Sequence, residues 1–449
     1  MQMTLPPPVL RALSILDQQG FSAYVVGGCV RDAVLGTPPH DYDMCTSARP
    51  EEMQRVFRRF RTLETGLRHG TLTVLMDGMP LEITTFRVDG DYADHRHPDS
   101  VSFTRLVEDD LARRDLTVNA MAFNPREGLV DPFHGEADCR AGIIRCVGEP
   151  ECRFEEDALR ILRALRFSAR LGFPIEEKTG EALLRMRESL RLVSAERIAA
   201  ELNGLLIGKN AHQVLAAYPE VLFTVLPDLA AMKNCPQQCV YHDKDVWTHT
   251  LRTVESIPRE PLLRWAALMH DCAKPLFRVR DAQGGDHFTG HPEKGAEMAA
   301  NMLRALKMPA RMTEQVSELV LWHDRVVEEK DVQWLLSRLG AEQTERLLLL
   351  RRADLTAHAP WIARNAEENY RVLHGKMEAL LRENACISLR QLAVNGRDMT
   401  ALGIRGALIG ETLARMLDMV TLGEAANEKE ALLSVARQAL ENGKGSEQK

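Results

Sequence analysis

The feature that most constrains the fold is the segment YVVGGCVRDAVLGTPPHDYD, which joins a strand, a glycine turn and a helix near the N-terminus. Its apolar run, residues 24–26, predicts a short buried strand. At Gly27 and Gly28 the absent side chains let backbone N–H groups approach a bound anion. We expect Arg31 and Asp32 to open a helix, so that a helix N-terminus and a guanidinium face one triphosphate. A Gly-Gly pair alone is equally consistent with an ordinary turn.

Two aspartates, Asp41 and Asp43, follow this expected helix. In a strand, residues i and i+2 project from one face and can chelate together, and hard carboxylate oxygens suit Mg²⁺. Two such ions about 3.5–4 Å apart can activate a 3′-hydroxyl and stabilise a leaving pyrophosphate in one in-line displacement. An Asp-x-Asp triplet alone is more often an acidic surface turn, here after Pro38-Pro39. The pair therefore gains its meaning from the glycine turn before it.

Taken together, Gly27-Gly28, Arg31-Asp32, Leu35-Gly36 and Asp41-x-Asp43 resemble the signature of the class II CCA-adding tRNA nucleotidyltransferase and bacterial poly(A) polymerase family. The resemblance implies an α/β nucleotidyltransferase head that adds nucleotides from CTP and ATP to the 3′ end of tRNA without a nucleic-acid template. It also implies Mg²⁺ as the cofactor of the head, with Asp41 and Asp43 as its catalytic ligands. Gly27, Gly28 and Arg31 would contact the nucleotide.

Length, charge and cysteine usage set the outer limits. A chain of 449 residues with 45% hydrophobic residues has room for two to four domains and is too apolar to be mostly disordered. A formal net charge of −7 means that any RNA contact must use a local basic patch. The sequence shows neither a secretory signal pattern nor 18 consecutive uncharged apolar residues, which predicts a cytoplasmic protein with no membrane partner. Nine scattered cysteines indicate reduced thiols, and Cys235 with Cys239 is a weak zinc candidate.

Helical patterns flank the motif segment. Residues 9–18 have helical spacing and are expected to pack against the head, and Pro50 marks the start of a helix over residues 51–60. A group of arginines near the end of the second helix faces either RNA or solvent, and a solvated basic face is the more usual outcome. The group comprises Arg55, Arg58, Arg59 and Arg61.

A hairpin is expected beside the catalytic strand. Residues 71–75 and 81–86 alternate as strands do, and Asp77-Gly78 between them supplies the turn. Glu82 lies on the second strand. It is either a third carboxylate near the metals or an ordinary strand residue hydrogen-bonded to Arg87.

Two further segments match the resembled family. The polar run at residues 89–100, DGDYADHRHPDS, predicts a mobile loop over the site. In that family a loop here assists the switch from CTP to ATP and is typically shortened in members that add only CC, so its presence favours complete CCA addition. Arg113-Arg114-Asp115 followed by LTVNAMA matches the second family motif, which implies that Arg114 contacts the nucleotide. Adjacent arginines alone are commonly surface charge, although a guanidinium can clamp phosphate oxygens bidentately.

A long amphipathic helix is predicted to start at Glu156-Asp157. Its apolar positions share one face, and Arg160, Arg163 and Arg166 lie on the other. Asp157 and Arg160, one turn apart, are placed either to offer an acceptor and donors to a base edge or to form an i,i+3 salt bridge. The resemblance implies the first role, with Asp157 and Arg160 pairing with CTP or ATP and Arg163 and Arg166 reaching the nucleotide or its phosphates. The run SAERI, residues 194–198, resembles the next family motif, a helix start.

A second chemical centre is expected further along the chain, where histidines and aspartates are separated by helical stretches. The adjacent pair His270-Asp271, preceded by the apolar run at residues 262–269, resembles the HD phosphohydrolase domain. The resemblance implies a divalent metal of unspecified identity, held in two-metal members by His249, His270, Asp271, His291, His323 and Asp354. Lys274 also matches, whereas Ala273 stands where many members have Gly. His242 and His287 are alternative ligands.

These motifs predict an α/β nucleotidyltransferase head, with a small mixed sheet and helices, followed by a mostly α-helical neck, HD domain and tail. The expected bounds are 1–145 for the head, 146–228 for the nucleotide-selecting neck, 229–360 for the HD domain and 361–449 for the tail. The tail, with LAVNGRD at residues 392–398, resembles the tRNA-binding end of Gram-positive-type CCA-adding enzymes.

The favoured function is addition of C, C and A to the tRNA 3′ end with release of pyrophosphate, together with HD-domain phosphatase or phosphodiesterase activity. A poly(A) polymerase that adds only A to RNA 3′ ends would use the same catalytic motifs. Hydrolysis in the HD domain as the main activity, or RNA binding without chemistry, are the alternatives from other classes. The carboxylates and arginines of the head argue against both.

Overall fold

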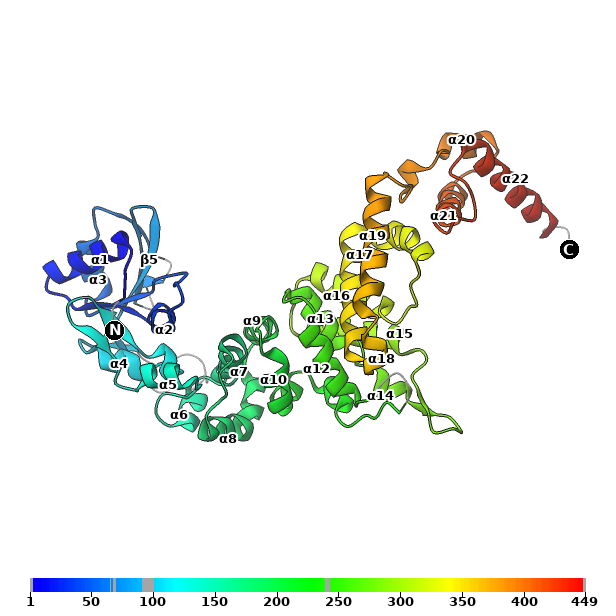
Figure 1. Cartoon of the computed structure of the whole chain (residues 1–449). Helices are drawn as coiled ribbons and strands as arrows, with labels where there is room; N and C mark the ends of the chain where they lie inside the picture. Colours follow the sequence, from blue (N-terminus) through cyan, green and yellow to red (C-terminus); the bar gives the residue numbers. More distant parts are fainter. Residues whose placement is uncertain (1–2, 65, 68–69, 91–100, 239–242, 447–449) are drawn as a thin grey trace. The chain divides into compact units, whose positions relative to one another are not determined.

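The chain forms two compact units, Met1–Ala230 and Ala231–Lys449. The computed structural model describes residues 3–64, 66–67, 70–90, 101–238 and 243–446. The first unit contains a seven-stranded mixed sheet with helices, and the second is almost entirely helical (Figure 1). This confirms the predicted α/β head with a helical remainder. No helix in the described ranges combines the length and apolar character needed to cross a membrane.

The main sheet has the strand order β3-β4-β5-β2-β1-β8-β9, in which β2 and β5 are parallel and the other neighbours antiparallel. The predicted hairpin is confirmed as β4 and β5, and β5 lies beside the strand that follows the two aspartates. The strands are β1 (Ala23–Val26), β2 (Met44–Thr46), β3 (Arg61–Leu63), β4 (Thr71–Met76), β5 (Met79–Thr85), β8 (Ala122–Asn124) and β9 (Gly128–Val130), with a separate pair β6 (Arg87–Asp89) and β7 (Val101–Phe103).

The two faces of this sheet differ. Cross-strand register puts Leu72 of β4 opposite Ile83 of β5, and both are fully buried, as is Met44 of β2 beside Ile83. Side chains alternate along a strand, so Asp43 and Glu82 belong to the opposite face. Helices α1 (Pro7–Gln18) and α3 (Pro50–Val56) both contact β4. The buried side chains of β4 all belong to the Leu72 face, so these two helices cover that face. The aspartates and Glu82 thus face away from α1 and α3.

Three local expectations for the head need correction. Asp41 and Asp43 precede β2 instead of lying in a strand, and the Asp43 carbonyl accepts the Val26 N–H at the strand entry (2.9 Å). Helix α2 (Gly28–Val34) begins three residues before Arg31, directly at the glycine turn. Helix α3 ends at Val56, so Arg58 and Arg59 lie in the turn that follows it. The remaining head helices are α4 (Val107–Ala112), η2 (Thr117–Asn119) and α5 (Gly135–Ala141).

The predicted helix at Glu156 is interrupted. Helix α6 ends at Glu156, Asp157 is extended (φ −149°, ψ 104°), and α7 begins only at Leu159. The Asp157 carboxylate accepts the Leu159 N–H (3.1 Å), and this contact caps the new helix. The expected helix start at Ser194 is confirmed. Neck helices are α6 (Pro150–Glu156), α7 (Leu159–Leu171), α8 (Glu177–Met186), η3 (Arg187–Leu192), α9 (Ala195–Leu206), α10 (Ala211–Ala217), α11 (Pro219–Val225) and η4 (Pro227–Met232).

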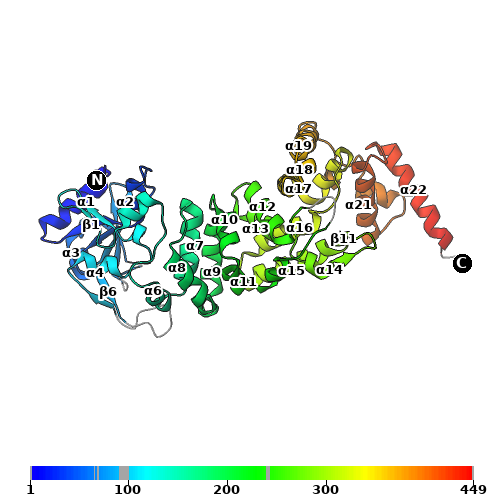
Figure 2. The ribbon, with the colours of Figure 1, turned by 60° about the horizontal axis from the view of Figure 1, so that its bottom comes forward.

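In the second unit, the predicted apolar helix is α13, which ends at Met269 directly before His270. Helices α12 and α13 lie side by side in both Figure 1 and Figure 2 and contact each other. Gly340, at φ 75°, breaks α17 into two helical segments. The elements are α12 (Val246–Ser256), α13 (Pro261–Met269), α14 (Lys274–Phe277), β10 (Val279–Arg280), β11 (Asp286–His287), α15 (His291–Ala305), α16 (Ala310–Trp322), η5 (Glu329–Asp331), α17 (Val332–Ala357), α18 (Pro360–Ala363), α19 (Ala366–Arg382), η6 (Leu389–Gln391), α20 (Gly396–Ala401), α21 (Ala407–Thr421) and α22 (Lys429–Ser446).

Candidate functional site

A pocket of about 360 Å³ in the first unit brings together most of the residues predicted for the head site. Its wall comes from four separate stretches: the glycine turn with α2, the approach to β2, the segment between α4 and η2, and α7. The predicted residues that line it are Gly27, Gly28, Arg31, Asp41, Asp43, Arg114, Arg163 and Arg166, and Asp32, His40, Asp115, Asn119, Phe167 and Arg170 complete the lining. Asp157 and Arg160 are not part of it.

Gly27 is required by its surroundings. Its backbone is left-handed (φ 78°), and a Cβ placed there would lie 3.1 Å from a guanidinium nitrogen of Arg114. Gly28, the first residue of α2, would bring its Cβ 3.6 Å from the guanidinium of Arg31. The turn therefore brings backbone close to two cationic side chains, a geometry that suits an anion.

The carboxylates of the pocket repel one another. Burial raises the pKa of Asp43, and the nearby Asp41 and Glu82 raise it further, while Arg114 opposes them. Parallel register places Glu82 beside Asp43, which agrees with this electrostatic coupling. A divalent cation would relieve the repulsion and displace the proton, so the donor set suits hard metal ions. Among the described residues, every group of three or more potential metal ligands within 4.8 Å of one another lies in the second unit. The carboxylates of the head are therefore more widely spaced than the ligands of the second unit.

Two of the predicted arginines are held by neighbouring side chains. Arg31 is almost fully buried and donates to Asp32 (2.7 and 2.9 Å) and to Asn119 Oδ1 (2.6 Å). Arg114 lies 3.4 Å from Asp110, a fully buried carboxylate that also binds Arg113. The Nε of Arg114 is buried and donates to no described atom. This unused donor, beside Gly27 and Asp43, is available to an oxyanion.

Helix α7 contributes two arginines whose guanidinium groups form ion pairs with buried carboxylates. Arg163 pairs with Asp115 (2.6 Å), and Arg166 pairs with Glu201 of α9 (2.9 Å). Burial opposes ionisation of Asp115, but Arg163 more than compensates and holds its pKa below the usual value. For Glu201 burial dominates and raises the pKa despite Arg166 and Arg163. Sequence reasoning missed Glu201, because its role depends on contact between two helices.

Asp157 and Arg160, predicted as one base-reading pair, have different partners. Arg197 donates to Asp157 Oδ2 (2.6 Å), whereas Arg160 pairs with Glu156 and donates to the carbonyl oxygens of Arg153 (3.3 Å) and Arg113 (2.9 Å). The alternative weighed for this pair, an i,i+3 salt bridge, does not form, since Asp157 lies outside α7. Arg197 was not singled out, although it stands inside the matched run at residues 194–198. That run was the available signal.

The predicted ligands of the second unit meet in one buried cluster. Asp271 is central: its Oδ2 lies 3.2 Å from His270 Nε2 and 3.6 Å from His249 Nε2, while its Oδ1 lies 3.4 Å from both His291 Nε2 and His323 Nε2. Asp354 completes the first group at 2.9 Å from His249. The two oxygens of one carboxylate thus face two separate pairs of imidazoles.

Hydrogen bonds donated by the ring Nδ1 atoms fix the tautomers of three histidines. His270, His291 and His323 place Nδ1 2.7–2.8 Å from the carbonyl oxygens of residues 267, 288 and 320, so each Nδ1 carries the donated proton. Their Nε2 atoms, left for another partner, face one another and Asp271: those of His291 and His323 lie 3.3 Å apart. Apart from the ion pair of Oδ2 with Lys274, the oxygens of Asp271 accept no hydrogen bond from a described residue. Acceptors converging in this way fit metal cations.

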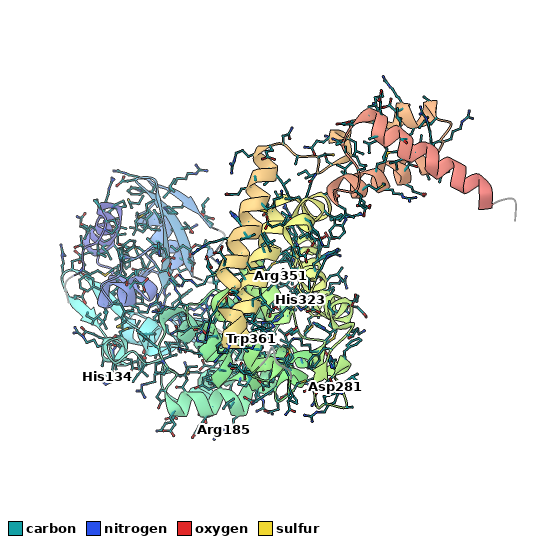
Figure 3. The ribbon with its side chains drawn as sticks, turned by 45° about the vertical axis from the view of Figure 1, so that its right-hand side comes forward. His134, Arg185, Asp281, His323, Arg351 and Trp361 are labelled. Carbon is teal, nitrogen blue, oxygen red and sulfur yellow. The ribbon has the colours of Figure 1, made fainter. Side chains whose placement is uncertain are left out.

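Electrostatics in this cluster favours an ionised Asp271. Burial opposes ionisation, yet His270 and Lys274 hold the pKa of Asp271 well below its usual value, with Lys274 Nζ 2.7 Å from Oδ2. The local geometry at Ala273, where many HD domains have Gly, still leaves His270 and Asp271 facing the cluster. His323 is held further by Arg351, which donates to its carbonyl oxygen (2.8 Å); both are labelled in Figure 3.

The alternative histidines stand differently. His287 binds Asp281 at the surface (2.7 Å) and is not among the clustered ligands. His242 and Cys239 lie outside the described residues. So do residues 91–100 of the expected loop. His358 was missed: it lies one turn after Asp354 on the chain and forms a third potential ligand group with His249 and Asp354. Its spacing of four residues from Asp354 was the available signal.

Three known family models match parts of this chain. Residues 23–145 match the poly A polymerase head domain, residues 172–232 the probable RNA and SrmB-binding site of polymerase A, and residues 241–358 the HD domain. A curated CCA-adding enzyme of Lactobacillus delbrueckii subsp. bulgaricus is 33% identical over 421 residues, which is 94% of each chain.

Two solved structures of CCA-adding enzymes are similar to this chain over nearly its whole length. The crystal structure of the Bacillus stearothermophilus CCA-adding enzyme in complex with CTP has a TM-score of 0.75 at 29% identity, over 98% of this chain and 100% of that one. A Thermotoga maritima CCA-adding enzyme complexed with tRNA CCA, at 21% identity and a TM-score of 0.59, shares the fold over 97% of this chain and 96% of its own.

Proposed function

The chain belongs to the class II CCA-adding enzymes, and from that premise we propose how its residues divide the work of adding C, C and A to the tRNA 3′ end. The substrates are CTP, ATP and tRNA. The proposed domains keep the bounds expected from the sequence: head 1–145, neck 146–228, HD domain 229–360 and tail 361–449. The protein is proposed to act in the cytoplasm.

Asp41 and Asp43 act as the metal-binding pair of the head. Their mutual repulsion, together with Glu82, supports this role, because a divalent cation bound among these carboxylates would relieve it. When bound, Mg²⁺ supplies Lewis-acid stabilisation of the attacking 3′-oxygen and of the leaving pyrophosphate. The chain's own part is to hold the carboxylates opposite the glycine turn, so that the triphosphate has one orientation.

The triphosphate is bound by the turn and the arginines around it. Gly27 and Gly28 let backbone N–H groups of the α2 N-terminus approach phosphate oxygens, and Arg114 adds its unused Nε donor. Arg163 and Arg166 of α7 line the same pocket, and each is oriented by an ion pair with a carboxylate, Asp115 for Arg163 and Glu201 for Arg166. Arg31 acts chiefly by fixing α2 against Asn119, since its own donors are engaged.

Base selection falls to Asp157 and Arg160, which lie just before and within the first turn of α7, the helix that supplies Arg163 and Arg166 to the pocket. In its present contacts Asp157 is held by Arg197, and Arg160 by Glu156. The oxygens of the Asp157 side chain are acceptors that suit the amino groups of cytosine and adenine and disfavour the carbonyls of uracil and guanine. This preference explains why CTP and ATP are used without a nucleic-acid template.

The observation that carries the proposal is the 360 Å³ pocket, which places the two aspartates opposite arginines from three distant stretches. The test is Asp43→Ala assayed with tRNA lacking CCA. Addition of both CMP and AMP should be abolished while tRNA affinity persists, because the change removes charge from the step that both nucleotides share. Normal turnover by a folded Asp43→Ala protein would refute the metal assignment.

A second activity is proposed for the HD domain, hydrolysis of phosphomonoesters or cyclic phosphodiesters with a divalent metal. The Nε2 atoms of His270, His291 and His323 lie 3.2–3.4 Å from the oxygens of the buried Asp271, and this convergence of potential ligands supports the proposal. His249, His270 and Asp354 would hold one ion, and His291 and His323 the other, with Asp271 between them. A metal bound there would activate water as the nucleophile.

The test compares wild type with Asp271→Ala on two tRNAs, one ending in a 2′,3′-cyclic phosphate and one in a free hydroxyl. Wild type should extend both, and the variant only the free hydroxyl, because the HD cluster and the head pocket share no residue. Equal extension of both substrates by both proteins would show that the HD domain does no end repair. Loss of extension on the free hydroxyl by a folded variant would show that the two centres depend on each other.

A further inference from the structure

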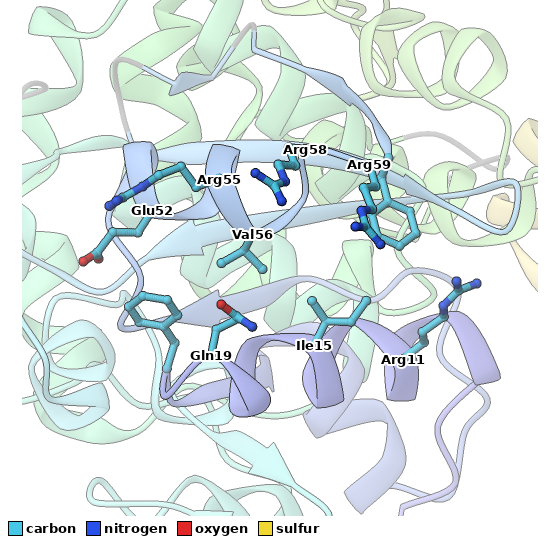
Figure 4. A pocket seen from close by; sticks show the side chains of 10 residues that line it. Arg11, Ile15, Gln19, Glu52, Arg55, Val56, Arg58 and Arg59 are labelled. Atoms are coloured by element: carbon cyan, nitrogen blue, oxygen red, sulfur yellow. The ribbon is translucent and has the colours of Figure 1, made fainter.

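A second pocket of the head, about 740 Å³ and so about twice the volume of the catalytic one, lies between α1 and α3. Figure 4 shows its two walls. Arg11 and Ile15 on α1 and Gln19 directly after it form one, and Arg55, Val56, Arg58 and Arg59 on α3 and the turn after it form the other. We call it the arginine pocket. Arg55, Arg58 and Arg59 belong to the basic group for which the sequence favoured a solvated face over RNA contact.

The charge in the arginine pocket is unbalanced. Arg55, Arg58 and Arg59 form no ion pair with any described residue, and Arg55 donates only to the Glu51 carbonyl (3.3 Å). The single carboxylate of the lining, Glu52, is already engaged by the Arg49 N–H (2.7 Å) and by Arg105. Three guanidiniums therefore surround one pocket with no counter-charge of their own, in a chain whose formal net charge is −7.

The aromatic rings of the pocket are already covered. The guanidinium of Arg11 lies 5.3 Å from the centre of the Phe60 ring, and that of Arg105 lies 5.8 Å from the Phe21 ring. A site that recognises bases offers free aromatic faces for stacking. The arginine pocket instead offers planar guanidinium groups, which bind phosphate oxygens and do not distinguish one base from another.

The position of the pocket separates it from catalysis. Helices α1 and α3 cover the Leu72 face of the sheet, while Asp43 and Glu82 belong to the other face. One sheet and one helical layer span on the order of 20 Å. We propose that the arginine pocket is a binding site for the backbone phosphates of RNA, which holds a tRNA chain independently of its sequence and outside the catalytic pocket.

The proposal rests on tRNA as the substrate and is tested by affinity, not by chemistry. The variant is Arg55→Gln/Arg58→Gln/Arg59→Gln, measured by fluorescence anisotropy with labelled tRNA between 50 and about 300 mM salt. Each lost phosphate contact lowers the slope of log K against log salt by about 0.7–0.9, so three should lower it by roughly 2–3. We expect Kd at low salt to rise on the order of 10-fold, with kcat for CMP addition unchanged at saturating tRNA.

A matched control removes the same charge elsewhere. Arg126, Arg140 and Arg311 are each exposed and each paired with a carboxylate, so the triple Gln variant at these positions should keep the wild-type slope. Arg58→Gln alone should lower the slope by about 1, which provides the test if the triple variant does not fold.

Identical Kd and slope for the pocket and control variants would overturn the proposal. If the pocket variant instead lost affinity for CTP or pyrophosphate while its tRNA curves stayed unchanged, the ligand would be a free polyphosphate and the RNA assignment wrong. Failure of the catalytic proposal looks different, since Asp43→Ala would then add nucleotides normally.

Discussion

Replacing Arg197 with Met should relax nucleotide choice, because Arg197 holds the carboxylate proposed to read the base. Its guanidinium lies 2.6 Å from Asp157 Oδ2, and the two side chains are only 25% and 17% exposed. The opposite oxygen of Asp157 accepts the Leu159 N–H, so loss of Arg197 removes one of the two contacts that orient this carboxylate. Methionine keeps much of the length and the apolar stem of arginine while removing its charge and its donors.

The expected magnitude follows from the burial of this pair. A charge-assisted hydrogen bond contributes about 1.5–3 kcal/mol, which corresponds to roughly a 10- to 150-fold change in a rate ratio. We therefore expect kcat/KM for CTP and ATP to fall about 10- to 100-fold, with a much smaller fall for UTP and GTP. Arg185→Met is the control: its pair with Glu151 has the same length, 2.6 Å, but 63% and 42% exposed side chains, and Arg185 lies at the surface in Figure 3.

The assay measures single-nucleotide addition to tRNA lacking CCA, with each of the four NTPs in turn and each variant. Thermal unfolding of both variants serves as the check on folding. If all four values of kcat/KM fall by the same factor in Arg197→Met, the arginine supports the neck structure and does not orient a base-reading group. A change of the same size in Arg185→Met would also refute the reasoning, because that pair is too exposed to matter.

Other consequences can be measured on the same protein. Asp41→Ala should lower addition of CMP and AMP alike by at least about 100-fold while tRNA Kd changes less than about twofold, as tested by binding and rapid-quench assays; a change in CMP addition alone would contradict a shared metal site. Since burial, Asp41 and Glu82 raise the pKa of Asp43, its contribution to stability is present below its unfolded pKa of about 3.9 and is lost as pH rises through the folded value. Asp43→Asn should therefore raise Tm in EDTA by about 2 °C at pH 8 and progressively less toward pH 4, and a gain that is independent of pH would contradict this linkage. Mn²⁺ at about 100 times its Kd should stabilise the second unit by about 2.7 kcal/mol in wild type and much less in Asp271→Ala, measured as a shift of Tm, and equal shifts would refute the HD metal assignment.

Much of the fold was predictable because its signals are local. The strand before Gly27, the β4–β5 hairpin and the helix before His270 each follow from a short apolar pattern and a turn or motif residue. The six HD residues were also predictable as a set, since the resemblance specified them and the structure brings them together.

What could not be predicted depends on contacts between distant residues. Asp157 leaves the helix because its side chain caps Leu159 and binds Arg197, forty positions away. The periodicity of the surrounding residues still indicates a helix, so the pattern alone misplaces Asp157. Glu201 and His358 were missed for a related reason, since their roles arise from the packing of α9 on α7 and from a cluster assembled by several helices.

The central claim, addition of C, C and A in that order, is tested most directly by supplying NTPs one at a time. Purified protein is incubated with tRNA lacking CCA and with CTP, ATP, UTP or GTP alone, then with CTP and ATP together, and the products are resolved at single-nucleotide length. The account predicts addition of two nucleotides with CTP alone and of three with the mixture, with no extended tails. A ladder of adenylates from ATP alone, on this tRNA, would identify a poly(A) polymerase and contradict the account.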